Sequence, residues 1–134
     1  MGLNYRRRYR TWIRTPLVLL NAAILAGTFT LYLINEHVLK SLTNNAFLHG
    51  HFNDALAMWI YLPYLNVLLS LYPYRVLSIT SYPACFGVAL VAGLGWEYLT
   101  PLFLTNSVSD PVDLLMYLIS GLAYAFFMKR VTVS

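Results

Sequence analysis

The sequence predicts an all-α, polytopic membrane protein: a compact four-helix transmembrane bundle with both termini in the cytoplasm. The 134 residues are 59% hydrophobic and only 10% charged, with a mean hydropathy of +0.60, whereas soluble domains carry about 25% charged residues. Four apolar segments each approach the roughly 20 residues that a spanning helix needs. The basic residues gather on one side of these segments, as the positive-inside rule describes. The length allows one membrane domain, residues 1–134.

The first helix is expected over residues 16–34, after a basic segment, residues 1–15, that holds five arginines. Such a cluster is typical of a cytoplasmic segment that faces anionic lipid. No basic domain with interleaved aromatic residues follows, so nucleic acid is not an expected partner. Helices rather than open strands are expected, because lipid leaves each backbone group to be satisfied within its own segment. The other three helices are expected over residues 55–72, 81–104 and 111–128.

The charges fix the expected topology. Eight of the nine Lys and Arg residues fall on the side of the termini, and only Lys40 falls on the other. The polar loops, residues 35–53 and 105–110, therefore face outward. The five acids all lie at or near the outward helix ends: Glu36, Asp54, Glu97, Asp110 and Asp113. The positive-inside rule places little constraint on acids, so their one-sided position is a separate observation, and it predicts an outward-facing acidic pocket.

Glu97 is the most informative acid, because the apolar residues around it place it inside the third helix, about one turn from the end. A charged residue at a helix centre costs about 2.5–3.5 kcal/mol on insertion scales, and less near the interface. An intramembrane carboxylate is therefore a functional hypothesis by default. The alternative is that Glu97 extends to the interface or pairs with a histidine.

Asp110 and Asp113 open the fourth helix, and ordinary helix-start chemistry explains part of their presence. Asp110 suits the N-cap, Pro111 the first helical position, and both acids suit the positive end of the helix dipole. Asp113 also begins a polar stripe at helical spacing, which should face the bundle interior rather than lipid. That stripe continues through Tyr117, Ser120 and Tyr124.

The second helix begins with a histidine-rich segment. Asn53 could cap this helix, which would leave Asp54 in its first turn. Alternatively, Asp54 faces the other acids across the bundle, with His49 or His51 above it. Because imidazole and carboxylate groups are metal ligands, His49, His51 and Asp54 form a candidate divalent-cation site. No fixed-spacing ligand motif supports this site, and no other cofactor is evident.

Small residues indicate where helices meet, because they let two backbones approach closely. They lie on the third helix at Gly87, Ala89, Gly93 and Gly95, and on the fourth at Gly121 and Ala125. Two deeper amides, Asn21 and Asn66, are expected to form hydrogen bonds across the bundle.

The second half resembles the VanZ-like family of small bacterial membrane proteins, over residues 90–125. The resemblance rests on Glu97 late in a helix, the D-x-x-D of Asp110 and Asp113 after a polar loop, and Gly121 beyond it. It implies a multi-pass protein of the bacterial cytoplasmic membrane, in a family whose founding member is linked to teicoplanin resistance. It also implies that the three acids act together. The chain departs from the family pattern at Thr100, Ser107 and Tyr117, where Gln, Arg and Asn are common.

The leading functional hypothesis is a binding or accessory module for an envelope lipid, glycan or cation. Its pocket residues are Asp54, Glu97, Asp110, Asp113 and Tyr117. An enzyme acting on a lipid-linked substrate is an alternative, because paired carboxylates can serve as general acid and base. A transporter of small solutes or divalent cations, and a structural subunit, are the others. The expected partners are the lipid bilayer and a second copy or another membrane protein.

Overall fold

The computed structural model describes residues 2–72, 77–106 and 109–133, and within these ranges it contains helices and no strands. The all-α prediction is therefore confirmed. The elements are α1 (Gly2–Ile34), η1 (Asn35–Leu39), α2 (Lys40–Leu42), α3 (Ala46–Gly50), α4 (Phe52–Ser70), α5 (Tyr82–Leu94), η2 (Gly95–Leu99), α6 (Thr100–Phe103) and α7 (Pro111–Val133). Each half contains a long helix, a five-residue π-helical turn (η1 or η2) with one glutamate, and a returning helix.

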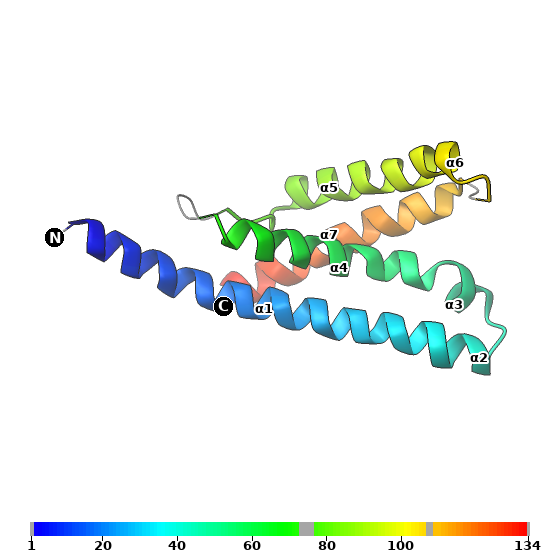
Figure 1. Ribbon diagram of the computed structural model, residues 1–134, viewed down its shortest axis with the longest axis horizontal. Coiled ribbons are helices and arrows are strands. Elements are labelled where there is room, and N and C mark those ends of the chain that lie inside the picture. Colours follow the sequence, from blue (N-terminus) through cyan, green and yellow to red (C-terminus); the bar gives the residue numbers. More distant parts are fainter. Residues whose placement is uncertain (1, 73–76, 107–108, 134) are drawn as a thin grey trace.

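The four long helices lie side by side in the order α1, α4, α7, α5 (Figure 1). The contacts follow this order: α1 packs on α4, α4 on α7, and α7 on α5, whereas α4 and α5 make few contacts. The connections through η1, α2 and α3 and through η2 and α6 meet at one end of the molecule, the loop end (residues 35–54, 95–106 and 109–113). The start of α1 and the end of α7 lie toward the other end, the terminal end.

Three helical stretches are long and apolar enough to cross a membrane: Pro16–Leu42, Tyr82–Phe103 and Pro111–Thr132. They correspond to the first, third and fourth predicted helices. The second predicted helix exists as α4, which has 19 residues, but α4 is not among these three. Asn53 and Asp54 near its start and Asn66 and Ser70 near its end lower the mean hydropathy of α4.

Several boundaries differ from the prediction. Helix α1 already begins at Gly2, so the basic segment is helical and continuous with the first span. The predicted polar loop over residues 35–53 is mostly helical, because η1 and α2 extend α1 and a capped turn, α3, follows. Asn45 caps α3, with its side chain accepting from the backbone N–H groups of Phe47 and Leu48 at 3.0 and 3.3 Å. Arg75 and Ser107 lie outside the described residues.

The polar stripe predicted on the fourth helix faces the interior, as expected. Tyr117, Ser120 and Tyr124 are 6%, 4% and 0% exposed. Ser120 Oγ donates to the carbonyl oxygen of Ala55 on α4 at 2.6 Å, and Tyr117 also bonds to α4. A polar stripe thus holds α7 against α4, because its groups find partners there instead of facing lipid.

Tyr124 joins the two predicted amides at the terminal end. Its hydroxyl accepts from Asn66 Nδ2 at 2.8 Å and donates to Asn21 Oδ1. Asn66 also pairs with the backbone of Ile79, accepting at 2.6 Å and donating at 3.0 Å. Three helices are therefore tied by uncharged hydrogen bonds, and the expectation that these asparagines bond across the bundle is confirmed.

Candidate functional site

The predicted pocket residues come from three elements and meet at the loop end. Helix α4 supplies Asp54, η2 supplies Glu97, and the first turns of α7 and the residue before it supply the rest. Tyr117 Oη donates to Asp54 Oδ1 at 3.0 Å. Asp113 and Glu97 are the charged neighbours of Asp54, and the same three carboxylates surround the Tyr117 hydroxyl. The structure thus brings the predicted pocket residues into one group, here the acidic cluster: Asp54, Glu97, Asp110, Asp113 and Tyr117.

A π-helical turn positions Glu97. The turn Gly95–Leu99 adds a residue to one helical repeat, which changes the direction of the side chains that follow, and such turns are frequent at functional sites. Glu97 is 5% exposed, and its Oε2 accepts from the backbone N–H of Asp110 at 2.8 Å. The carboxylate therefore bridges the helical stretch Tyr82–Phe103 and the start of α7. The prediction that Glu97 lies inside the third helix, toward its end, is confirmed.

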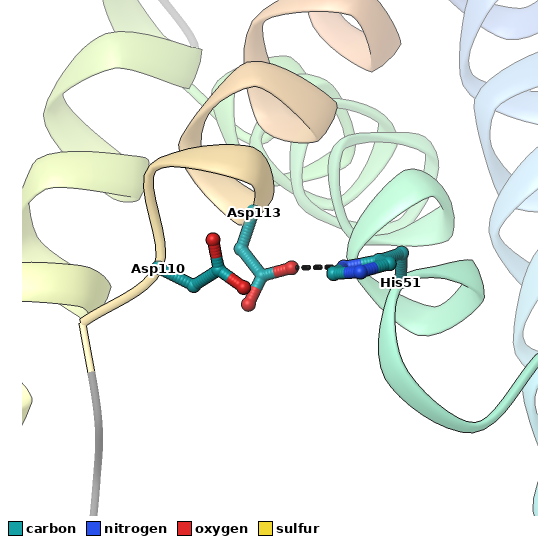
Figure 2. A group of neighbouring side chains, drawn as sticks. All are labelled: His51, Asp110 and Asp113. Atoms are coloured by element: carbon teal, nitrogen blue, oxygen red, sulfur yellow. Dashed lines mark hydrogen bonds and ion pairs between the residues drawn. The ribbon is translucent and has the colours of Figure 1, made fainter. Parts of the chain in front are cut away.

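The two aspartates at the start of α7 have different roles. Asp110 Oδ1 accepts from the Val112 N–H at 2.8 Å, which is the predicted N-cap bond, and Pro111 begins the helix. Asp113 Oδ1 instead lies 2.6 Å from His51 Nδ1 (Figure 2). The Asp110 carboxylate lies beside that of Asp113, on the side away from the histidine (Figure 2). An N-cap role thus explains Asp110, but it does not explain why the Asp113 side chain points toward His51.

The grouping of possible metal ligands differs from the predicted set. Ligand atoms of His51, Asp110 and Asp113 lie within 4.8 Å of one another. His49 is directed elsewhere, with Nε2 at 2.8 Å from the Thr43 carbonyl oxygen, and Asp54 bonds to Tyr117. Imidazole and carboxylate ligands suit a divalent cation, but here the histidine and one carboxylate already form a close pair.

His51 is the basic neighbour of the cluster. The hydrogen bond to Asp113 raises the pKa of His51 above its ordinary value, and the negative charges of Asp113, Asp110 and Asp54 act in the same direction, while partial burial opposes them. A protonated His51 balances the charge of one carboxylate. With all four carboxyl groups ionised, the cluster would therefore keep a net negative charge.

The lysine at the loop end does not compensate this charge. Lys40 pairs with Glu36 one turn earlier in the chain. Glu36 also accepts from Asn53 Nδ2, and Asn53 Oδ1 accepts from Asn35 Nδ2 at 3.0 Å. Asn53 thus joins η1 to α4 and does not act as the predicted cap, because α4 already begins at Phe52. No local sequence pattern indicates this hydrogen-bond network, because its bonds join residues that are 17 or 18 positions apart.

An apolar groove lies between α4 and α5, where these helices make few contacts. It has a volume of about 830 Å³, within the range of about 300–1,000 Å³ typical of small-molecule sites. Its lining is Ala57, Met58, Tyr61, Leu65, Gly87, Val88, Val91, Ala92, Gly95, Trp96, Leu99 and Tyr117. Tyr117 belongs to both sites: its ring lines this groove and its hydroxyl bonds to the acidic cluster.

The small residues of the third helix divide between two faces. A Cβ on Gly93 would lie 2.7 Å from Leu114 Cδ1, so this glycine permits the close packing of α5 on α7. A Cβ on Gly87 or Gly95 would meet nothing within 4 Å. The prediction of helix contact is therefore correct for Gly93 and wrong for Gly87 and Gly95, which line the groove. Helical spacing of four could have separated the two sets, because residues 85, 89, 93 and 97 share the buried face.

Neither a scan against protein-family models nor searches of curated proteins and solved structures give a match. The resemblance to the VanZ-like family thus stays a prediction from the residues of the second half.

Proposed function

We propose that the protein is a binding module of a bacterial cytoplasmic membrane, in which the acidic cluster forms an outward-facing pocket for a cationic group of an envelope molecule. The observation that carries this proposal is the gathering of four carboxyl groups at the loop end beside one histidine, with no lysine or arginine paired to them among the described side chains. Each of the four accepts a hydrogen bond from an N–H or O–H group, and Asp54 and Asp113 also interact with each other. Carboxyl groups crowded at a membrane interface with little positive charge nearby favour a ligand that supplies both charge and N–H donors.

The proposed topology has four spanning helices and cytoplasmic termini. Helix α4 is about 28 Å long at 1.5 Å per residue, close to the roughly 30 Å of a hydrocarbon core. The polar residues that lower its hydropathy bond to protein: Asn53 to η1, Asp54 to Tyr117, and Asn66 to Tyr124. Eight of the nine basic residues then lie on the cytoplasmic side. An Asn44→Cys variant at the loop end should react with a membrane-impermeant thiol reagent in intact cells; protection until lysis would contradict this orientation.

The binding proposal can be tested with headgroups that carry no hydrocarbon chain. In detergent-solubilised protein, glycerophosphoethanolamine should shift the NMR signals of the His51 ring in a saturable manner. Glycerophosphoglycerol, which has no ammonium group, should not. Asp113→Asn should remove the response, because the variant lacks a carboxylate of the cluster. Glu36→Gln serves as the matched control at the same end, since Glu36 is paired with Lys40 outside the cluster. Equal responses to both headgroups would contradict the proposal.

A further inference from the structure

The groove has the length and chemistry of a site for one hydrocarbon chain. Its residues on the stretch Tyr82–Phe103 run from Gly87 to Leu99, which is about 18 Å at 1.5 Å per residue. This length is close to the roughly 15 Å that one leaflet contributes to a bilayer core of about 30 Å. Apart from the tyrosine hydroxyls and the Trp96 indole, the lining side chains are aliphatic, thioether or glycine. A chain of the outer leaflet could therefore lie along it without losing hydrogen bonds.

The groove leads toward the acidic cluster. Trp96 lines it and precedes Glu97 in η2, and Ala57 lines it one turn beyond Asp54. Tyr117 is shared by both. A ligand that occupied the groove would thus have one end beside the carboxylates of the acidic cluster. Trp96 is 61% exposed, as suits an aromatic side chain at the interface between chains and headgroups.

We propose that the groove binds a hydrocarbon chain of an outer-leaflet lipid whose headgroup ends in an ammonium group. One molecule then fills both sites, with its chain between α4 and α5 and its ammonium at the acidic cluster. This inference rests on the proposed function, because it assigns the cationic group to a lipid. Charge complementarity selects the headgroup, since the cluster holds four carboxyl groups, three of them acting on one histidine, and no lysine or arginine pairs with them among the described side chains.

A helix of a second copy fits the groove less well. A helix about 10 Å wide and 18 Å long occupies roughly 1,400 Å³, which exceeds the groove volume of about 830 Å³. A helix would also place its own apolar side chains beside the carboxylates, where it offers no positive charge. The lipid accounts for both the apolar lining of the groove and the carboxyl groups at its end.

The test uses nanodiscs that hold the full chain and trace amounts of lipid with a photoreactive acyl chain. Phosphatidylethanolamine and phosphatidylglycerol probes with identical chains are compared, and labelled residues are mapped by mass spectrometry. The groove residues of α4 and α5 should be labelled about tenfold more by phosphatidylethanolamine, the ratio that one charge-assisted hydrogen bond of about 1.4 kcal/mol gives. An excess of unlabelled phosphatidylethanolamine should suppress this labelling.

Groove-filling variants separate the two proposals. Gly87→Leu with Gly95→Leu should reduce groove labelling at least fivefold, because the added side chains meet open space and occupy it. Gly27→Leu is the matched control, since a Cβ there also meets nothing within 4 Å but lies on α1. If the double variant Gly87→Leu with Gly95→Leu loses groove labelling yet still responds to glycerophosphoethanolamine, both proposals are supported.

Other outcomes overturn one proposal or both. Unchanged labelling in the filled variant, with the headgroup response intact, would overturn the groove inference and leave the proposed function standing. Equal labelling by both lipids, in the groove and on α1 alike, would mean ordinary lipid contact and would overturn the inference. A wild-type protein with no headgroup response at all would overturn the proposed function and, with it, the assignment of an ammonium lipid.

Discussion

The hydrogen bonds around Tyr124 allow a quantitative prediction for Tyr124→Phe. The variant keeps the ring but removes the oxygen that accepts from Asn66 and donates to Asn21. Asn66 retains both bonds to Ile79, whereas Asn21 Oδ1 loses its donor in a fully buried position. Side-chain hydrogen bonds between membrane helices contribute about 0.6 kcal/mol on average and up to about 1.7 kcal/mol. Two such bonds predict a loss of about 1–3 kcal/mol.

Reversible unfolding in mixed micelles, titrated with sodium dodecyl sulfate, measures this free energy. Tyr64→Phe is the matched control, because Tyr64 lies on α4 with a side chain that is 49% exposed; it should change stability by less than about 0.5 kcal/mol. The double variant with Asn21→Leu should lose less than the sum of the single losses, since both changes remove the same bond. If Tyr124→Phe and Tyr64→Phe unfold at the same detergent fraction, the hydrogen bonds do not hold the helices together and the reasoning is wrong.

Three further predictions concern packing and charge. Gly121→Ala should destabilise the protein by about 1–3 kcal/mol, because the new methyl group would lie 2.8 Å from the Cβ of Ala89 on α5. Gly27→Ala places its methyl group in open space and should be neutral or stabilising by up to about 1 kcal/mol. The same unfolding titration compares the two variants. NMR titration should give His51 a pKa above its ordinary 6.5. Asp113→Asn should lower that pKa toward 6.5, because the substitution removes the hydrogen bond that favours the imidazolium. A pKa that is the same in the variant would reject the pairing of His51 with Asp113. The raised pKa means that the contact contributes to stability fully below pH 6.5 and that this contribution is lost as the pH rises through the folded-state pKa. Loss of that proton makes the cluster more negative, so the affinity for an ammonium headgroup should rise over the same range, and His51→Gln should abolish both trends.

The sequence identified the acidic cluster because rare residue types stand out in an apolar chain. Glu97 is conspicuous as a lone carboxylate within a hydrophobic segment, and its burial follows from the cost of exposing charge to lipid. The stripe that begins at Asp113 was visible from helical spacing alone, and its partners were then limited to neighbouring helices. Local rules also gave the cap at Asp110, because N-cap bonds depend on residues two or three positions apart.

Other features depend on distances that no local pattern encodes. The pairing of His51 with Asp113 joins residues 62 positions apart, and the bond of Asn53 to Glu36 depends on how η1 meets α4. The π-helical turns were missed because they differ from an α-helix by one residue per repeat, which hydropathy does not register. The groove was missed because glycine permits both close packing and open space. Only the position of the neighbouring helix decides between the two, as Gly93 and Gly95 illustrate.

The polar side chains at the two ends of the molecule differ in kind. At the terminal end, the amides of Asn21 and Asn66 and the phenol of Tyr124 are uncharged and buried, which suits a purely structural role. At the loop end, the polar groups are ionisable, and three helices converge there without lysine or arginine paired to the cluster among the described residues. Uncharged side chains with the same hydrogen bonds would hold the helices together at lower electrostatic cost. Helix capping accounts for Asp110 and Glu97 in part, and the proposed cationic ligand would account for the remaining charge, with the adjoining groove suited to a hydrocarbon chain.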